Sequence, residues 1–289
     1  MTDGQPSADI RTRVELLLGA RTDAWRRVHG GYTPAARWIA TYGAQSAFVK
    51  VPTNDVTLRM LRDEGVIYAA ARGPFMPRLV AWEDHEAEPI LVIEDLSHAI
   101  WPPPWTRENV EAVRAAIAAM HATTAPAPRF ADKLARHMHG WPLVEQNPAP
   151  FLSLGLVDAR WLNQCLPILL AAERACETEG EALTHWDIRS DNICITPSGA
   201  KLIDWAAACR SNPKLDLGGW APSLAFEGGP QPEELVGHAP EVAALISGYF
   251  AARAGLPPIP SAPRVRKVQK RQLSVALPWV IRALRLPTL

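Results

Sequence analysis

The 289-residue sequence has only four cysteines, no net charge and no long apolar run. The cysteines are scattered at positions 165, 176, 194 and 209 and form no C-x-x-C pair. This spacing argues against a disulfide framework and against a zinc site with cysteine ligands. We therefore expect reduced thiols in a cytoplasmic protein.

The charge balance and the lack of a long apolar segment argue against two classes of partner. Lys plus Arg and Asp plus Glu each number 30, so no net charge favours nucleic acid or an anionic membrane. No apolar run approaches the roughly 18 residues of a membrane span. The N-terminal segment also lacks the order of a signal peptide. We expect neither a nucleic acid nor a membrane as a partner.

The composition favours a folded, globular protein. Hydrophobic residues make up 48% of the sequence, which argues against disorder. The length is sufficient for one large domain or for two lobes. Amphipathic or apolar spacing predicts helices over residues 8–20, 106–121, 231–254 and 263–287.

The most informative stretch, residues 183–205, reads LTHWDIRSDNICITPSGAKLIDW. Two short apolar runs joined by Pro-Ser-Gly predict a hairpin, which places Asn192 and Asp204 at the same end. An amide oxygen and a carboxylate suit Mg²⁺, which prefers a few oxygen ligands together with phosphates and water. Asp187 precedes the hairpin on a loop, from which it can orient an attacking hydroxyl. These side chains also fit a plain role as loop caps and turn residues.

This stretch resembles the catalytic loop and metal-binding segment of protein-kinase-like proteins, H-x-D-x-x-x-x-N followed by an aspartate. The I-D-W form at the second motif is similar to the aminoglycoside phosphotransferase and choline kinase family. The resemblance implies an α+β, protein-kinase-like bilobal fold. A small antiparallel-sheet lobe with one main helix would bind the nucleotide over residues 1–96. A hinge near 94–97 would lead to a mostly helical catalytic and acceptor-binding lobe over 97–289.

The same resemblance implies a reaction and its participants. The γ-phosphate of ATP, with GTP possible, would move to a hydroxyl group of a small-molecule acceptor, with Mg²⁺ held by Asn192 and Asp204. Asp187 would take the proton of the hydroxyl. Arg189 occupies the place of the catalytic-loop lysine and would contact the transferring phosphoryl group, or else pair with Asp191 and be structural. A monomer or a homodimer is expected.

Lys50 lies within an apolar strand predicted over residues 47–51 and needs a partner, since an unpaired buried ammonium is unfavourable. A helix predicted over 55–72 follows, and Glu64 faces its apolar side at spacings of three and four residues. Asp63 is the other candidate partner, and a lysine at a strand edge could instead reach solvent. By resemblance, Lys50 holds the α- and β-phosphates and Glu64 is its partner.

Two further segments are assigned to the nucleotide by resemblance. Residues 25–42 read as strand, glycine turn and strand, with Thr33 at the Ser/Thr place of a nucleotide-covering loop. A plain hairpin turn explains this segment equally well. In the hinge, the backbone near Glu94 and Leu96 would hydrogen-bond adenine. Asp216, in a D-L motif that opens a helix, would brace the catalytic loop or act as a helix cap.

The sequence gives opposing signals about the acceptor. Acidic residues between 227 and 241 would suit a polycationic aminoglycoside, but residues 264–289 hold seven Lys or Arg and no acid. This basic end departs from the family. Five tryptophans could line a pocket for a flatter acceptor, such as a nucleoside or a macrolide sugar, or could belong to the core.

We therefore expect a phosphotransferase that acts on an antibiotic, of the aminoglycoside, nucleoside or macrolide type. One alternative is a small-metabolite kinase for choline, homoserine or a sugar. Another is a catalytically inactive nucleotide-binding module, against which the full set of motif residues argues. A third alternative, nucleic-acid binding by the basic C-terminal helix, is weakened by the zero net charge.

Overall fold

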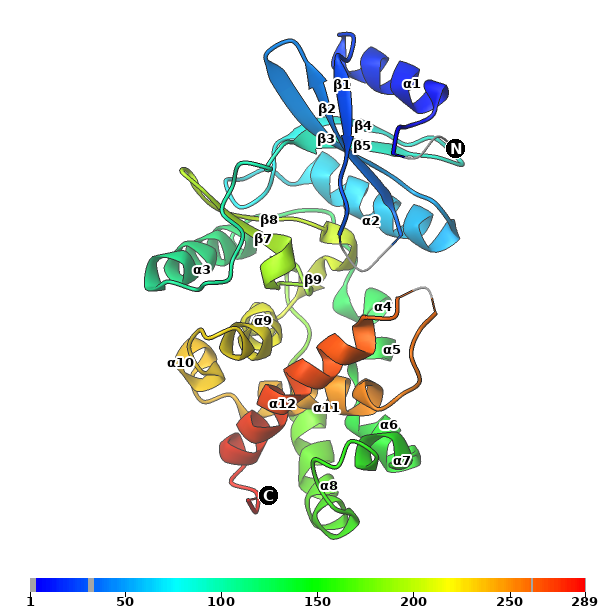
Figure 1. Cartoon of the computed structure of the whole chain (residues 1–289). Helices are drawn as coiled ribbons and strands as arrows, with labels where there is room; N and C mark the ends of the chain where they lie inside the picture. Colours follow the sequence, from blue (N-terminus) through cyan, green and yellow to red (C-terminus); the bar gives the residue numbers. More distant parts are fainter. Residues whose placement is uncertain (1–3, 31–33, 261, 289) are drawn as a thin grey trace.

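Five strands near the N-terminus form one antiparallel sheet with the order β1-β2-β3-β5-β4. The computed structural model in which this sheet is seen describes residues 4–30, 34–260 and 262–288. The sheet and the helices that follow it form two lobes, one above the other in Figure 1, which confirms the predicted α+β bilobal fold. The strands are β1 (Ala24–Arg27), β2 (Ala36–Tyr42), β3 (Gln45–Val51), β4 (Leu79–Glu83) and β5 (Ile90–Glu94).

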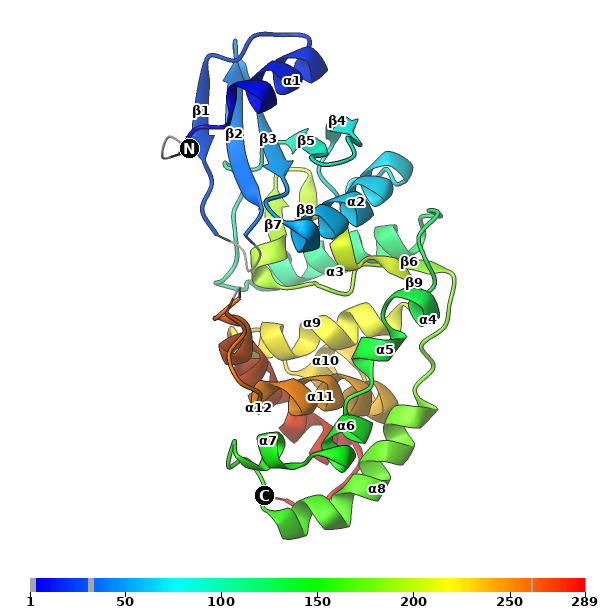
Figure 2. The same ribbon diagram turned by 90° about the vertical axis from the view of Figure 1, so that its right-hand side faces the viewer.

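Two helices, α1 (Ala8–Leu18) and α2 (Asp55–Ala70), cover the sheet (Figures 1 and 2). Side chains alternate between the two faces of a strand. Val49 and Val51 of β3 therefore join the buried cluster that includes α1. Lys50, between them, points the other way and reaches α2. The alternation along β3 thus decides that this lysine faces the second lobe and not the α1 side.

Two short sheets connect the lobes: β7 pairs with β8, and β6 pairs with β9. The predicted hairpin is the β7–β8 pair, so Asn192 precedes its first strand and Asp204 follows its second. Asn192 is the last residue of one short 3-10 turn, and Asp204 is the residue just before another. The elements are β6 (Ala182–Thr184), β7 (Ile193–Thr196), β8 (Gly199–Leu202), β9 (Cys209–Ser211) and the 3-10 turns η1 (Ser190–Asn192) and η2 (Trp205–Ala207).

The second lobe is built from helices packed around α11, which contacts α5, α6, α7, α8, α9 and α12. No helix in the described ranges combines the length and the apolar character needed to cross a membrane. The helices are α3 (Arg107–His121), α4 (Phe130–Lys133), α5 (Ala135–Met138), α6 (Trp141–Gln146), α7 (Ala149–Leu152), α8 (Ala159–Ala175), α9 (Lys214–Phe226), α10 (Pro232–Val236), α11 (Pro240–Ala254) and α12 (Val265–Ala283).

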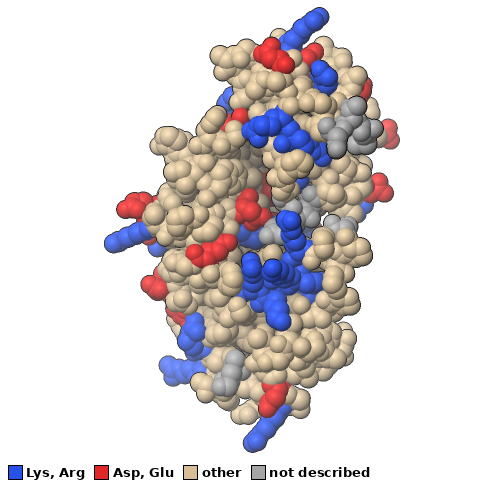
Figure 3. Space-filling model, viewed as in Figure 1, with Lys and Arg blue, Asp and Glu red and all other residues tan. Residues whose placement is uncertain are grey.

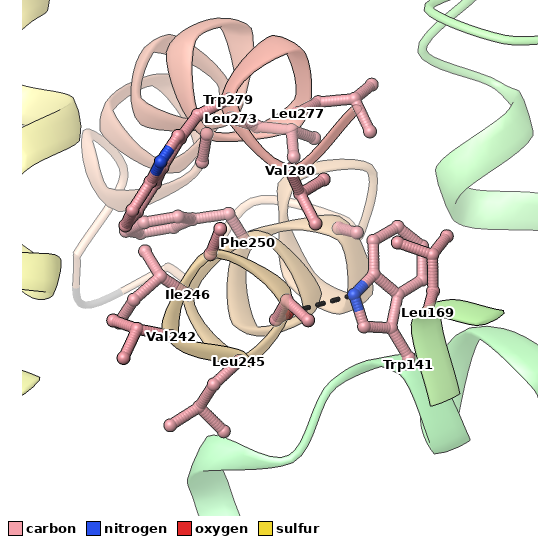
Figure 4. Close-up of a cluster of buried hydrophobic side chains, with 14 of the residues drawn as sticks. Trp141, Leu169, Val242, Leu245, Ile246, Phe250, Leu273, Leu277, Trp279 and Val280 are labelled. Carbon is pink, nitrogen blue, oxygen red and sulfur yellow. Dashed lines mark hydrogen bonds between the residues drawn. The ribbon is translucent and has the colours of Figure 1, made fainter. Parts of the chain in front are cut away.

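Helix α11 is buried on nearly all sides because its sequence is apolar or small all round. Figure 4 shows Leu273, Leu277 and Trp279 of α12 facing it, with Phe250 between the two helices. On the opposite side the indole Nε1 of Trp141 donates a hydrogen bond to the Ala244 carbonyl at 2.9 Å. The apolar contacts fix α12 against α11, and the Trp141 hydrogen bond fixes α6 against its other side.

The single helix predicted over residues 231–254 is wrong, because the structure has two helices there, α10 and α11. Gly237 lies between them with φ of 75°, a conformation that favours glycine. Pro240 then opens α11, where its missing N–H leaves no helical hydrogen bond unmade. The apolar pattern runs across this break and does not reveal it.

Glu173 of α8 is a buried carboxyl group that the sequence pattern did not single out. Its side chain is 1% exposed and accepts hydrogen bonds from the backbone N–H groups of Gly140 at 2.8 Å and Trp141 at 3.3 Å. Burial raises the pKa of Glu173 from 4.5 to about 7, and the two hydrogen bonds oppose this only in part. The folded state therefore holds a proton that the unfolded chain releases.

We expect this group to make the protein less stable as pH rises from 4.5 to about 7. The free energy of unfolding should fall by about 3 kcal/mol over this pH range, because Glu173 stays protonated in the folded state and is ionised in the unfolded state. Glu173→Gln keeps both acceptor contacts without the charge. It should raise the unfolding free energy by about 1–3 kcal/mol near pH 8 and change it little near pH 5. Urea denaturation at both pH values measures this, with the exposed Glu177→Gln as the control. An equal increase in the free energy of unfolding for both variants would contradict the assignment of this pH dependence to Glu173.

Candidate active site

A cavity of about 580 Å³ lies between the sheet lobe and the helical lobe. Its walls come from the sheet, α2, the segment after β5, the loop before β7 and the end of β8. Residue 33 lies outside the described ranges, so the structure does not place Thr33, but His29 and Gly30 of the same loop line the cavity. The other eight predicted site residues all line it: Lys50, Glu64, Glu94, Leu96, Asp187, Arg189, Asn192 and Asp204.

Lys50 bridges two carboxylates at the centre of this cavity. Its Nζ lies 2.5 Å from Glu64 Oε2 and 3.1 Å from Asp204 Oδ1. Because β3 pairs with strands on both sides, Lys50 is not at a sheet edge, and it is 7% exposed. The partner on α2 is Glu64, whereas Asp63 pairs with Lys133 at 3.3 Å.

Two opposing effects set the pKa values in this cluster: burial, which disfavours the charged forms, and ion pairing, which favours them. Burial would lower the pKa of Lys50, but Asp204 and Glu64 outweigh it and hold that pKa above its ordinary value. Burial raises the pKa of Glu64 despite the attraction of Lys50. The pKa of Asp204 is lowered, because Lys50 more than offsets its burial. Lys50 is therefore a firmly charged ammonium in a water-poor site.

The loop before β7 is shaped by Asp216 of α9. Its carboxylate accepts the backbone N–H of His185 at 3.0 Å and of Trp186 at 2.8 Å, and it lies 2.9 Å from the Nε2 of His121. Trp186 has φ of 64°, an unusual backbone conformation for a bulky residue, and these contacts hold it there. The predicted bracing role of Asp216 matches this geometry.

His185 fixes the loop to the end of the hairpin. Its Nε2 donates to the Ile203 carbonyl at 3.0 Å, and its Nδ1 accepts the Asp187 N–H at 3.3 Å. Burial lowers the pKa of His185, with Asp216 opposing, so the ring is neutral with the proton on Nε2. Asp187 is thereby directed into the cavity from a rigid turn.

Asn192 and Asp204 provide oxygen atoms that fit Mg²⁺. The Asn192 amide nitrogen donates to the Asp187 carbonyl at 2.9 Å and to its Oδ2 at 3.0 Å, which leaves the amide oxygen as an acceptor. Asp204 has φ of 65°, which turns it out of the strand direction at the end of the hairpin. No group of three or more His, Cys, Asp or Glu in the described ranges could hold a metal. One amide and one carboxylate match a Mg²⁺ ion that takes its remaining ligands from phosphates and water.

Arg189 lies between two aspartates, 3.2 Å from a carboxylate oxygen of Asp187 and 3.2 Å from one of Asp191. This position is compatible with both predicted roles of Arg189, contact with the phosphoryl group and structural pairing with Asp191. Its guanidinium lines the cavity and also pairs with Asp191. At the end of β5, the Glu94 side chain accepts from Lys201 at 3.1 Å and from the Arg78 N–H at 3.0 Å. The Glu94 side chain is therefore engaged in contacts within the protein, and the predicted contact of its backbone with adenine stays a prediction.

Arg37 of β2 is a cavity residue that the sequence reasoning missed. It lies directly opposite Lys50 in the β2–β3 register. Burial lowers its pKa, while Asp204 and Glu64 oppose this. The signal was the same one that identified Lys50, a cation inside a strand of mostly apolar residues.

A protein-family model described as the phosphotransferase enzyme family matches residues 24–256. Among solved structures, a thermostable mutant of the aminoglycoside phosphotransferase APH(4)-Ia, in a ternary complex with ADP and hygromycin B, is similar over 96% of this chain and 98% of its own. The TM-score is 0.60 and the identity 11%. Spectinomycin phosphotransferase, APH(9)-Ia, in complex with ADP and spectinomycin, gives a TM-score of 0.56 at 13% identity, over 97% and 94% of the two chains. No curated protein matches. At these identities the structural likeness establishes the fold.

Proposed function

The chain belongs to the phosphotransferase enzyme family, and we propose that it moves the γ-phosphate of ATP to a hydroxyl group of a small molecule. One observation carries the proposal. Lys50, paired with Glu64 and Asp204, lines the same cavity as Asp187 and Asn192, which are hydrogen-bonded to each other. A fixed cation, a set of oxygen ligands and a carboxylate base are the parts that phosphoryl transfer needs.

The nucleotide would lie between the lobes, with residues 1–96 as its binding lobe, 97–289 as the catalytic lobe and the hinge near 94–97. Lys50 would hold the α- and β-phosphate oxygens, and Glu64 would keep it in place. The backbone at Glu94 and Leu96 would contact the base, and the loop that contains Thr33 would cover the phosphates. The ADP complexes of the two similar structures support ATP as co-substrate; GTP is the alternative.

Asn192 and Asp204 would hold Mg²⁺, which when bound neutralises charge on the phosphate oxygens. Asp187 would orient the acceptor hydroxyl and take its proton as the oxygen forms its bond to the γ-phosphorus and the bond to the β-phosphate oxygen breaks. ADP and a phosphate monoester then leave. Arg189 would contact the transferring phosphoryl group, because its guanidinium adjoins Asp187 in the same cavity.

We expect Asp216→Asn to lower kcat by about 10–100-fold, because a loop held by fewer hydrogen bonds misplaces Asp187. An amide has one acceptor oxygen, whereas the carboxylate accepts two backbone N–H groups and contacts His121. Asp216 touches no reacting group, so the KM for ATP should stay near the wild-type value. Steady-state kinetics separate the two parameters, and a rise in KM with an unchanged kcat would contradict a positioning role.

An antibiotic is the first class of acceptor, supported by the likeness to the hygromycin B and spectinomycin complexes. Homoserine, choline and sugars form the second class. Homoserine and sugars carry no net positive charge, which suits the basic residues of α12, whereas choline is a cation. A location in the cytoplasm is supported by four cysteines that are all free and buried.

The proposal is tested by supplying ATP or GTP with Mg²⁺ and a panel of acceptors: aminoglycosides, macrolides, nucleoside antibiotics, choline, homoserine and sugars. The expected result is phosphate transfer to members of one class, lost in Asp204→Asn. Binding of nucleotide without transfer to any acceptor would favour an inactive module. Failure to bind either nucleotide would contradict the roles of Lys50, Asn192 and Asp204 together.

A further inference from the structure

A second cavity, of about 330 Å³, shares part of its lining with the first. Asp187, Arg189 and Val265 line both, and most of the other walls of the second come from α5, α9, α11 and α12. If the first cavity holds the nucleotide, as in the proposed function on which this inference rests, an acceptor whose hydroxyl meets Asp187 extends into the second. The side chains of the second cavity therefore indicate the chemical class of the acceptor.

The walls of this cavity are mostly apolar, and three of the lining residues are aromatic: Trp186, Tyr249 and Phe250. Aliphatic side chains such as Met138 and Ile246 complete them. Trp186 and Tyr249 are only half-buried, so both offer ring surface to a molecule in the cavity. Apolar and aromatic walls of this kind bind the apolar part of a small molecule, and aromatic rings add a preference for another ring.

Trp186 is fixed in the wall one residue before the proposed base. Its φ of 64° is rare for a bulky residue, and strained backbone of this kind concentrates at functional sites. Its ring packs against Phe130 with centroids 5.0 Å apart, and its Nε1 donates to Ser211 Oγ at 3.0 Å. The indole is thus a rigid surface beside the position at which the acceptor hydroxyl would react.

The charged groups in these walls are paired within the protein. Among the lining residues that the structure describes, Asp187 and Asp216 are the only acids and Arg189 is the only Lys or Arg. Asp216 is 1% exposed and accepts the backbone N–H groups of His185 and Trp186, while Asp187 lies 3.2 Å from Arg189. A charged acceptor of either sign would lose its hydration here without meeting an excess of opposite charge.

The remaining polar side chains of the lining are His137, Gln269 and Gln272. The two glutamines, on α12, are 7% and 6% exposed, and Gln269 accepts from Arg266 at 2.9 Å. An amide can donate and accept hydrogen bonds without carrying charge. These groups suit an uncharged polar group of the acceptor, such as a hydroxyl or a carbonyl.

The acidic segment predicted to bind a polycation does not reach this cavity. Glu233 pairs with Arg282 at 2.7 Å. Glu234 accepts the backbone N–H of Gln231, and Glu227 accepts from Trp105 and Ser190. None of these three carboxylates lines the second cavity.

The surface of α12 supplies no negative charge either. Residues 264–289 contain seven Lys or Arg and no acid. Figure 3 shows Lys and Arg side chains gathered over this helix, below the opening between the lobes. None of the seven lines the second cavity, so they form part of the outer surface and not of the acceptor site.

We propose that the acceptor is an uncharged alcohol with an apolar, ring-containing body. The ring lies against Trp186 and Tyr249, an uncharged polar group meets the glutamines of α12, and the hydroxyl faces Asp187. Aminoglycosides and choline do not belong to this class, because each would bring a positive charge into walls that have no carboxylate to spare.

Binding of three matched alcohols tests this inference. Each is a naphthalene with a hydroxymethyl group on one ring and, on the other, a carboxamide, an aminomethyl group or a carboxylate. Isothermal titration calorimetry is done on the full chain saturated with Mg²⁺ and AMP-PNP, so that no turnover occurs. We expect the uncharged amide to bind at least about tenfold more tightly than either charged alcohol. The uncharged polyol myo-inositol, which has no apolar body, should show no binding at about 1 mM.

Two variants test the aromatic surface. Trp186→Leu and Tyr249→Leu should each weaken the amide about threefold to tenfold, the range that an aromatic pair contributes. Tyr249 lies on α11 and not on the catalytic loop, so its variant tests the cavity without altering that loop. Trp105→Leu is the matched control, because this half-buried tryptophan lines neither cavity, and it should change the affinity by less than about twofold.

Four results would overturn the inference. They are equal or tighter binding of either charged alcohol, binding of myo-inositol as tight as that of the amide, equal effects of Tyr249→Leu and Trp105→Leu, and no binding of any alcohol at about 1 mM while AMP-PNP still binds. These results concern the acceptor alone and leave the proposed phosphotransferase function standing. Failure of the wild-type chain to bind AMP-PNP would instead contradict that function.

Discussion

Asp187→Asn is expected to lower kcat by a factor of about 10²–10⁴, the range that a positioned general base contributes. Asparagine has nearly the same shape, so the contacts with Asn192 and the backbone can persist. What is lost is the ability to accept the proton of the hydroxyl. The affinity for ATP should change little, because in the proposed function Asp187 acts on the acceptor hydroxyl and not on the nucleotide.

A matched control is present on the same loop. Asp191 also pairs with Arg189, but it is exposed, follows the turn and lines only the first cavity. Asp191→Asn should lower kcat by less than about tenfold, as expected for the loss of one member of a partly exposed ion pair. Equal losses in the two variants would mean that Asp187 acts only by holding Arg189. Stopped-flow or steady-state kinetics on both variants distinguish a general base from a residue that only holds Arg189.

Lys50→Met is expected to remove activity and also to lower the free energy of unfolding by about 3–5 kcal/mol. Glu64 is 2% exposed and would keep a buried negative charge without its cation, next to the carboxylate of Asp204. Urea denaturation measures the loss of stability. Lys133→Met, which breaks the more exposed pair with Asp63, should lower it by less than about 1 kcal/mol.

The double variant Lys50→Met, Glu64→Gln separates structure from function. Removing the charge of Glu64 should restore most of the stability, since the buried carboxylate no longer lacks a cation. Activity should not return, because no group replaces the ammonium at the phosphate oxygens. Recovery of activity together with stability would show that Lys50 is only a structural residue.

The site residues that could be predicted from the sequence are those fixed by local structure. Asp187, Asn192 and Asp204 lie on one loop and hairpin, so their spacing alone brings them together. Lys50 and Glu64 come from different elements, but each element has a simple period. Alternation along β3 sets the direction of Lys50, and helical spacing sets that of Glu64.

The features that could not be predicted depend on contacts between distant segments. Glu173 is buried because the start of α6 packs over it, and no periodicity in α8 identifies its partners. The second cavity is formed by the catalytic loop, α9, α11 and α12, whose relative positions are set only by packing. The acidic residues around 227–241 suggested a cation site by composition, but the pairing of Glu233 with Arg282 and the contacts of Glu227 with Ser190 and Trp105 could not be predicted from that composition.

Phosphorus NMR of the full chain with Mg²⁺, ATP and the acceptor panel supplied in pools tests the central claim most directly. The account predicts a new phosphate monoester resonance in one pool, with ADP formed in equal amount, and neither signal with Asp187→Asn. A wild-type sample that binds ATP yet forms no ester in any pool would contradict it, as would ester formation that continues at the same rate in the variant.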